Sequence, residues 1–183
     1  MSKRDPLWVC CVIANDAVNQ NGRYIRVGPN SVLRIRDAVG WVMAQLPVSD
    51  VVWVFGAGTA PEYSAGKTLA ALGEMALREQ LPAAKTLVNV HSWQHYGTDP
   101  EMRKIVRMVA EHIEFEPREV RFVFFTQKQH LRRVQLIWRL NFEGTWGKAR
   151  FVETGQTAEL SPWSEWLKRL NERRKYVWSL LSA

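Results

Sequence analysis

Short apolar runs alternate with longer amphipathic stretches along this chain. Five runs have the length and the β-branched and aromatic content of buried strands: residues 8–14, 51–55, 86–90, 120–126 and 149–153. After each run comes a stretch in which apolar side chains recur every three or four residues, the period of an amphipathic helix. This order predicts an α/β fold, a Rossmann-like three-layer α/β/α sandwich with a mainly parallel five-stranded sheet.

Capping residues and prolines mark the ends of the predicted helices. The first covers residues 31–46, with Asn30 or Ser31 as its cap and Pro47 after its end. The remaining predicted helices cover residues 67–80, 99–113, the region around 131–138, and the segment from 161 to the C-terminus. Residues 15–30 are polar and rich in Asn and Gly, so we expect a loop there, and residues 144–147 read as a turn.

Length and composition indicate a single domain, residues 1–183. With 46% hydrophobic and 23% charged residues, the chain can form one sizeable core and is short for two. Its N-terminal apolar segment is too short to cross a bilayer and lacks a clear cleavage site, so we expect the first strand of a cytoplasmic protein. Adjacent Cys10 and Cys11 would point to opposite faces of that strand, which favours two buried thiols over a disulfide.

A formal net charge of +7 favours anionic partners: nucleic acid, phosphorylated metabolites or an acidic membrane surface. Basic residues gather at 118–139 and at 168–175. The second group belongs to a Trp-rich predicted helix, residues 161–183, whose basic face could touch an anionic membrane, although docking on the chain's own domain is the commoner fate of such a helix. The nine tryptophans are scattered, so we interpret them as packing residues.

Candidate ligand-binding residues follow three of the predicted strands. Thr126, His130 and Arg133 lie at a strand-to-helix corner, where a hydroxyl, an imidazole and a guanidinium can all donate to phosphate or carboxylate oxygens. His130 is the candidate general acid or base. Right-handed crossovers would bring Asn15 and the turn Gly56-Ala57-Gly58 to the same edge of the sheet, where glycines allow a backbone N–H to approach a ligand.

Other familiar sites are not predicted. The segment Gly66-Lys67-Thr68 lacks the earlier glycine of a phosphate-binding P-loop, because Pro61 stands in its place. His91 and His95 have no Cys or carboxylate at ligand spacing, so no metal site is expected. These residues specify no cofactor.

Residues 126–133 resemble the Thr-Ser-x-x-His-x-x-Arg signature of the ElyC/SanA/YdcF domain family of unknown function, with Thr126, His130 and Arg133 in register. The turn Gly56-Ala57-Gly58 is similar to that family's Ser-Gly-Gly turn, and the order of elements agrees over residues 8–142. The resemblance implies a bacterial domain associated with envelope and lipid-carrier polysaccharide metabolism, or, in one branch, with binding of S-adenosylmethionine. Thr68 and Asn89 stand where the family carries glutamates, and neither role transfers without those acids.

Three functional hypotheses follow. The leading one is binding, with hydrolysis as an extension, of a phosphorylated or nucleotide-like small molecule at the carboxyl ends of the strands. The alternative is a degenerate, non-catalytic module that binds nucleic acid or a protein partner through its basic surface, including Lys168, Arg169, Arg173 and Arg174. An S-adenosylmethionine-binding protein ranks lowest, because a glycine-rich first loop and a ribose-binding acid are missing.

Overall fold

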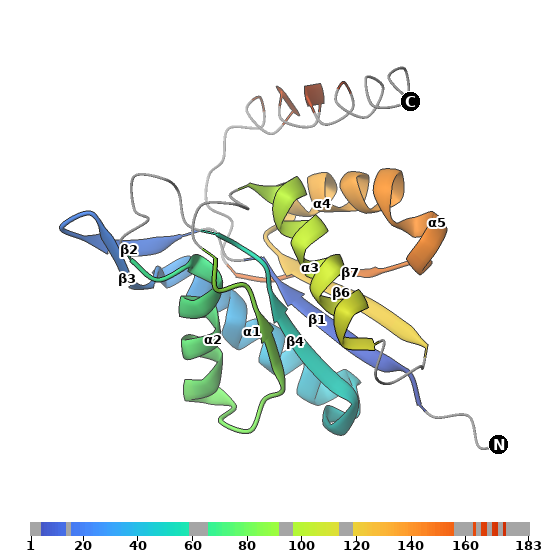
Figure 1. Ribbon diagram of the computed structural model, residues 1–183, viewed down its shortest axis with the longest axis horizontal. Helices are drawn as coiled ribbons and strands as arrows, with labels where there is room; N and C mark the ends of the chain where they lie inside the picture. The colour runs from blue at the N-terminus through green and yellow to red at the C-terminus, as the bar shows by residue number, and fades with distance from the viewer. Residues whose placement is uncertain are drawn as a thin grey trace.

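Five parallel strands form the centre of the molecule in a computed structural model (Figure 1). The structure describes residues 5–13, 16–58, 66–91, 97–113 and 119–155, together with residues 163, 166, 167, 170, 171 and 174. In sheet order, β5-β4-β1-β6-β7, the strands are Thr86–Val88, Val51–Phe55, Leu7–Val12, Val120–Thr126 and Arg150–Glu153. All four neighbouring pairs are parallel, which confirms the predicted Rossmann-like α/β fold.

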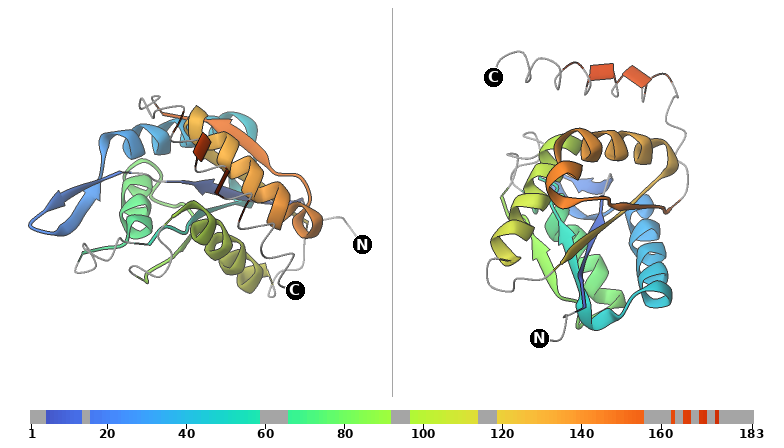
Figure 2. Two further views of the ribbon diagram at one scale, coloured as in Figure 1. Left: turned by 90° about the horizontal axis from the view of Figure 1, so that it is seen from above. Right: turned by 90° about the vertical axis from the view of Figure 1, so that its right-hand side faces the viewer.

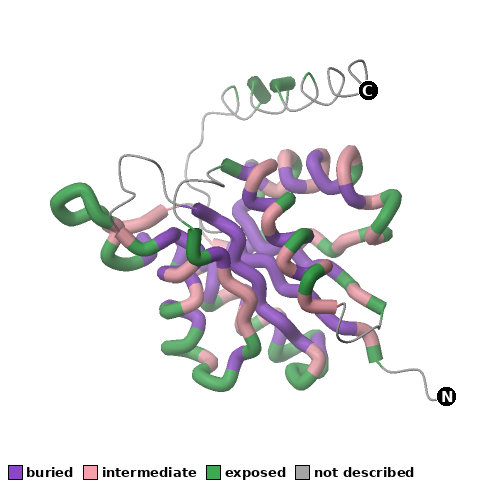
Figure 3. Tube along the Cα trace, in the orientation of Figure 1, coloured by how far each residue is buried: buried purple, intermediate pink, exposed green. Residues whose placement is uncertain are grey.

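Helices cover both faces of this sheet. Helices α1 (Pro29–Gln45) and α2 (Leu69–Gln80) share a hydrophobic core with alternate residues of β1, such as Cys10. Helices α3 (Thr98–Ile113) and α4 (Lys128–Asn141) share a second core with the intervening residues, such as Cys11. Figure 2 shows α1 and α3 on opposite sides of the sheet. Because β1 is buried on both faces, its sequence is a continuous apolar run (Figure 3).

Aromatic rings fill the core under α4. Trp138 is about 1% exposed, and its ring centroid lies 4.8 Å from that of Phe122 and 5.2 Å from that of Phe124. The buried indole N–H donates to the carbonyl of Gly147 at 2.9 Å. Trp138 therefore has the packing role predicted for the tryptophans, with its one polar atom satisfied.

The segment predicted as a loop between the first strand and the first helix holds a β-hairpin. Strands β2 (Ala17–Gln20) and β3 (Arg23–Val27) pair antiparallel beside the main sheet. Asn21 and Gly22 connect them with φ angles of 51° and 74°, both in the left-handed region that such a tight turn requires. The loop prediction was wrong because this hairpin is largely solvent-exposed and polar, and the Asn-Gly pair was the overlooked signal.

Two further differences concern short helices and the C-terminal segment. A 3-10 helix, η1 (Val48–Asp50), follows Pro47, and α5 (Glu143–Trp146) replaces the turn predicted at 144–147. Ser161 and Pro162, the predicted start of the last helix, lie outside the described residues, but the six described residues beyond 160 are helical. Among the described helices, none has the length and apolar character needed to cross a membrane.

Candidate functional site

Polar side chains converge where β1 and β6 end. The chain runs outward from β1 through β4 to β5 and then returns to β6 on the other side of β1. Connections therefore leave β1 and β6 in opposite directions. The carboxyl ends of these two strands are thus the switch point of the sheet, the usual position of a ligand-binding crevice in this class of fold. The backbone N–H of Ile13 donates to the carbonyl of Phe125 at 3.1 Å and holds the two ends together.

The three residues predicted at the corner between β6 and α4 form one hydrogen-bond network with Thr98 of α3. His130 Nδ1 lies 3.1 Å from Thr126 Oγ1, and His130 Nε2 lies 2.9 Å from Thr98 Oγ1. Arg133 Nη2 lies 2.7 Å from His130 Nε2 and 2.6 Å from Thr98 Oγ1. A guanidinium can only donate, so Nε2 accepts from Arg133, and the imidazole is neutral with its proton on Nδ1, donating to Thr126. The structure thus joins Thr126, His130 and Arg133, as their spacing predicted.

Glu101 adds a buried carboxyl group to this cluster. It lies one turn after Thr98 on α3 and is only 5% exposed. Burial raises its pKa to about 8, against the opposing influence of the guanidinium groups of Arg34 and Arg133. Its Oε1 atom has no hydrogen-bond partner among the described residues. A carboxyl group with this pKa is mostly protonated at neutral pH, so Glu101 itself carries little negative charge beside the two guanidinium groups.

Arg34 approaches the same point from α1 on the other face of the sheet. Its guanidinium is buried and donates to the carbonyl of Ile13 and, at 3.3 Å, to Oε1 of Gln127. Burial lowers its pKa to about 10, while Asp16 and Glu101 act in the opposite direction. Arg34 therefore ties the end of β1 to the start of α4.

Asp16 caps helix α1. Its carboxylate accepts from the backbone N–H groups of Asn30 at 3.1 Å and Ser31 at 2.8 Å, and from the Ser31 hydroxyl. The prediction that Asn30 or Ser31 caps this helix was wrong, because Gly28 is the N-cap residue and Asp16 supplies the acceptor from outside the helix. This helix end already binds a carboxylate of its own chain. The neighbouring Asn15, a predicted ligand-binding residue, lies outside the described residues.

The turn after β4, residues 56–58, packs against two helices, α2 and α3. The carbonyls of Ala57 and Gly58 accept from the N–H groups of Ala70 and Leu69, at 3.1 and 3.4 Å, at the start of α2. A Cβ atom on Gly56 would lie 2.8 Å from the backbone carbonyl oxygen of Glu101 and 2.6 Å from Cγ1 of Ile105. Gly56 thus allows the backbone of α3 to approach the end of β4 at Glu101.

Gly56→Ala is therefore expected to lower the free energy of unfolding by about 1–3 kcal/mol or more, because a backbone carbonyl cannot move aside as a flexible side chain can. Gly40→Ala is the matched control. Gly40 lies within α1 with no atom near its Cβ position, so alanine should stabilise the helix by about 0.5–1 kcal/mol. Urea unfolding of both variants measures the contrast, and equal effects would contradict the packing role of Gly56.

Thr68 and Asn89, the positions that the resemblance matched to glutamates, are in contact. The Thr68 hydroxyl donates to the carbonyl of Asn89 at 2.8 Å and accepts from the N–H of Ala71 at 3.1 Å, which caps α2. The Asn89 amide donates to the carbonyl of Gly56 at 3.1 Å. Both side chains are buried, and together they link the end of β5 to the turn after β4.

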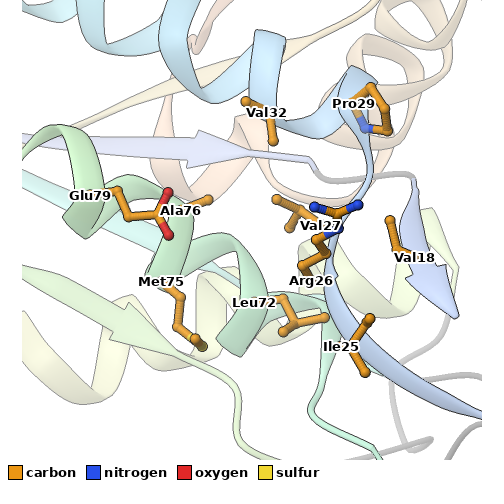
Figure 4. A pocket seen from close by; sticks show the side chains of 10 residues that line it. All are labelled: Val18, Ile25, Arg26, Val27, Pro29, Val32, Leu72, Met75, Ala76 and Glu79. Carbon is orange, nitrogen blue, oxygen red and sulfur yellow. The ribbon is translucent and has the colours of Figure 1, made fainter. Parts of the chain in front are cut away.

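A separate hollow lies between the hairpin and helices α1 and α2 (Figure 4). Its volume is about 340 Å³, and most of its wall is apolar, with Arg26 and Glu79 as the charged residues that line it. The lining residues are Val18, Ile25, Arg26, Val27, Pro29, Val32, Leu72, Met75, Ala76 and Glu79. None of the predicted ligand-binding residues that the structure describes contributes to this cavity.

Sequence reasoning missed Thr98, Glu101 and Arg34. The sequences of α1 and α3 do contain a sign of these residues. Each of the three polar side chains occupies a position on the buried face of its helix. Arg34 lies three residues after buried Ser31 and four before buried Ala38, and Glu101 lies four before buried Ile105. A charged residue at such a position indicates a buried polar contact.

Comparison with known proteins returns no match among family models, curated proteins or solved structures. The resemblance to the ElyC/SanA/YdcF family therefore stays a prediction. What the chain can do has to be argued from the crevice between β1 and β6.

Proposed function

We propose that this chain binds the anionic group of a phosphorylated or nucleotide-like small molecule at the carboxyl ends of β1 and β6. The observation that carries the proposal is that Arg34, His130 and Arg133 meet at the carboxyl ends of β1 and β6, where the buried Glu101 carboxyl group lies within the influence of both guanidinium groups. The Asp16 carboxylate is engaged by α1, and Glu101 is mostly protonated below about pH 8. An anion bound here would form charge-assisted hydrogen bonds with guanidinium groups.

Arg133 is the residue best placed to contact this ligand. Its side chain is part-exposed, whereas His130 and Thr98 are buried behind it. Both of these neighbours hold the same guanidinium nitrogen, so they position Arg133. The N-terminus of α4 has no side-chain cap and no acidic residue in its first turn, so its N–H groups favour an anion at the same place.

The geometry supports binding better than hydrolysis. Both ring nitrogens of His130 are engaged, with Nδ1 at Thr126 and Nε2 at Arg133 and Thr98. To act as a general base, His130 would have to release Arg133, the residue assigned to the anion. We therefore assign His130 a positioning role.

Arg133→Gln should reduce the affinity for such a ligand by about tenfold or more, because the charge-assisted hydrogen bonds are lost. The measurement is the ligand-dependent rise in the midpoint of thermal unfolding, with nucleotides, sugar phosphates, S-adenosylmethionine and short DNA or RNA as ligands.

Arg132→Gln is the matched control for this experiment. Arg132 is the exposed neighbour of Arg133, so the same change of charge there should leave the shift intact. Equal loss in both variants would indicate a general charge effect. No shift with any phosphorylated compound would remove the crevice from consideration.

A further inference from the structure

Exposed apolar side chains line one face of the C-terminal helical segment. Trp163, Trp166, Leu167 and Leu170 are 65%, 45%, 44% and 39% exposed. Their spacing, i, i+3, i+4 and i+7, places them on the same side of a helix, and we call them the Trp-Leu face. Elsewhere in the described chain no tryptophan is exposed to this extent: Trp53 and Trp138 are about 1% exposed, and Trp41 and Trp146 are half-buried. The domain therefore leaves these four apolar side chains exposed.

The sequence around this face is cationic. Residues 163–175 include five basic residues and two acidic ones. Arg174 is helical and exposed. The segment thus combines an apolar face, tryptophan and an excess of positive charge, the three features of helices that lie in the interface of a bilayer.

We propose that the Trp-Leu face binds the surface of a bilayer that contains anionic phospholipids. Tryptophan rings favour the headgroup level, because the ring is apolar and its N–H is polar. The two leucines add apolar area that enters the acyl boundary, and the basic residues pair with lipid phosphates. This inference concerns a different part of the chain from the crevice between β1 and β6, so it does not depend on the proposed ligand.

The described side chains favour a membrane over nucleic acid. Trp163 and Trp166 stack on each other, with ring centroids 4.9 Å apart and an angle of 18° between planes, so one face of each ring is already covered. Leu167 and Leu170 have no planar ring on which a nucleic-acid base could stack. A second copy of the chain fits less well, because two cationic segments would repel each other.

Co-sedimentation of the full chain with vesicles tests the proposal. Binding is expected to vesicles of phosphatidylcholine with phosphatidylglycerol and to be much weaker with phosphatidylcholine alone. Trp163→Ser with Trp166→Ser should reduce the affinity more than about tenfold, because two apolar rings are removed from the face. Lys168→Gln with Arg169→Gln should reduce it about thirtyfold, because each cation near an anionic surface favours binding about fivefold and the two factors multiply.

Two control pairs match these variants in kind. Met43→Ser with Val48→Ser removes exposed apolar side chains elsewhere, and Arg139→Gln with Lys148→Gln removes two exposed cations elsewhere. Both should bind vesicles like the unmodified chain.

Three results would overturn the proposal. The first is absence of binding, or equal binding to neutral and anionic vesicles. The second is salt-sensitive binding of RNA or DNA, with no vesicle binding, that the same substitutions abolish. The third is a concentration-dependent dimer in light scattering, again without vesicle binding, that the tryptophan substitutions abolish.

Discussion

Replacing Glu101 by glutamine should raise the free energy of unfolding by several kcal/mol at about pH 9 and change it little at about pH 4. The reason is the cost of a buried negative charge. Burial raises the pKa of Glu101 in the folded chain to about 8, from an ordinary value of 4.5. Glutamine has nearly the same shape and no charge to bury at any pH.

The direction of the pH dependence follows from proton binding. Between about pH 4.5 and pH 8 the folded chain holds a proton on Glu101 that the unfolded chain has released. Raising the pH across this window therefore favours unfolding, by about 1.4 kcal/mol for each pH unit and by about 5 kcal/mol at most. The contribution of protonated Glu101 is complete below about pH 4.5 and lost above about pH 8. Glu101→Gln abolishes this loss.

Urea unfolding at a series of pH values measures the difference. Glu111→Gln is the matched control on the same helix, because Glu111 is 58% exposed and paired with exposed Arg107. An exposed ion pair contributes about 0.2–1 kcal/mol, so this variant should follow the pH profile of the unmodified chain. If Glu101→Gln also runs parallel to that profile, Glu101 is not a buried carboxyl group in the folded state.

The central sheet was predictable because its strands are buried on both faces. Residues 51–55 and 122–125 appear in the sequence as unbroken apolar runs, and the structure forms β4 (Val51–Phe55) and β6 (Val120–Thr126) around them. The β2–β3 hairpin was not found, since it lies beside the main sheet, and its polar, half-exposed strands lack such a run. Burial of a strand in the core therefore produces a clearer sequence pattern than pairing of two strands at the surface.

The candidate site was predictable only where it is local in sequence. Thr126, His130 and Arg133 share one strand-to-helix corner, so their spacing alone places them together. Thr98 comes from α3, and its contact with His130 spans 32 residues. Arg34 comes from α1, and its contact with Gln127 spans 93 residues. Such contacts depend on how helices dock on both faces of the sheet, which periodicity does not specify.

Arg34→Met should lower the free energy of unfolding by about 3–5 kcal/mol, the typical cost of breaking a buried charged network by removing one partner. Methionine fills much of the space but cannot donate to the carbonyl of Ile13 or to Gln127. Asp16 and Glu101 would also lose a nearby positive charge. Arg36→Met is the matched control on the same helix, because the Arg36 side chain is 65% exposed, and its loss should change stability by no more than about 0.5 kcal/mol.

A double-mutant cycle then shows whether Arg34 and Glu101 interact. At about pH 9 Glu101 is largely ionised, so Arg34→Met should cost about 1–3 kcal/mol less when glutamine replaces Glu101. At about pH 6 Glu101 is protonated in the folded chain, and this coupling should shrink toward zero. Urea unfolding of the single and double variants at both pH values measures it. A coupling energy that is absent at pH 9, or equal at the two pH values, would show that Arg34 does not interact with the charge of Glu101. Arg34 would then stabilise the fold through its hydrogen bonds to Ile13 and Gln127 and through the charge of Asp16.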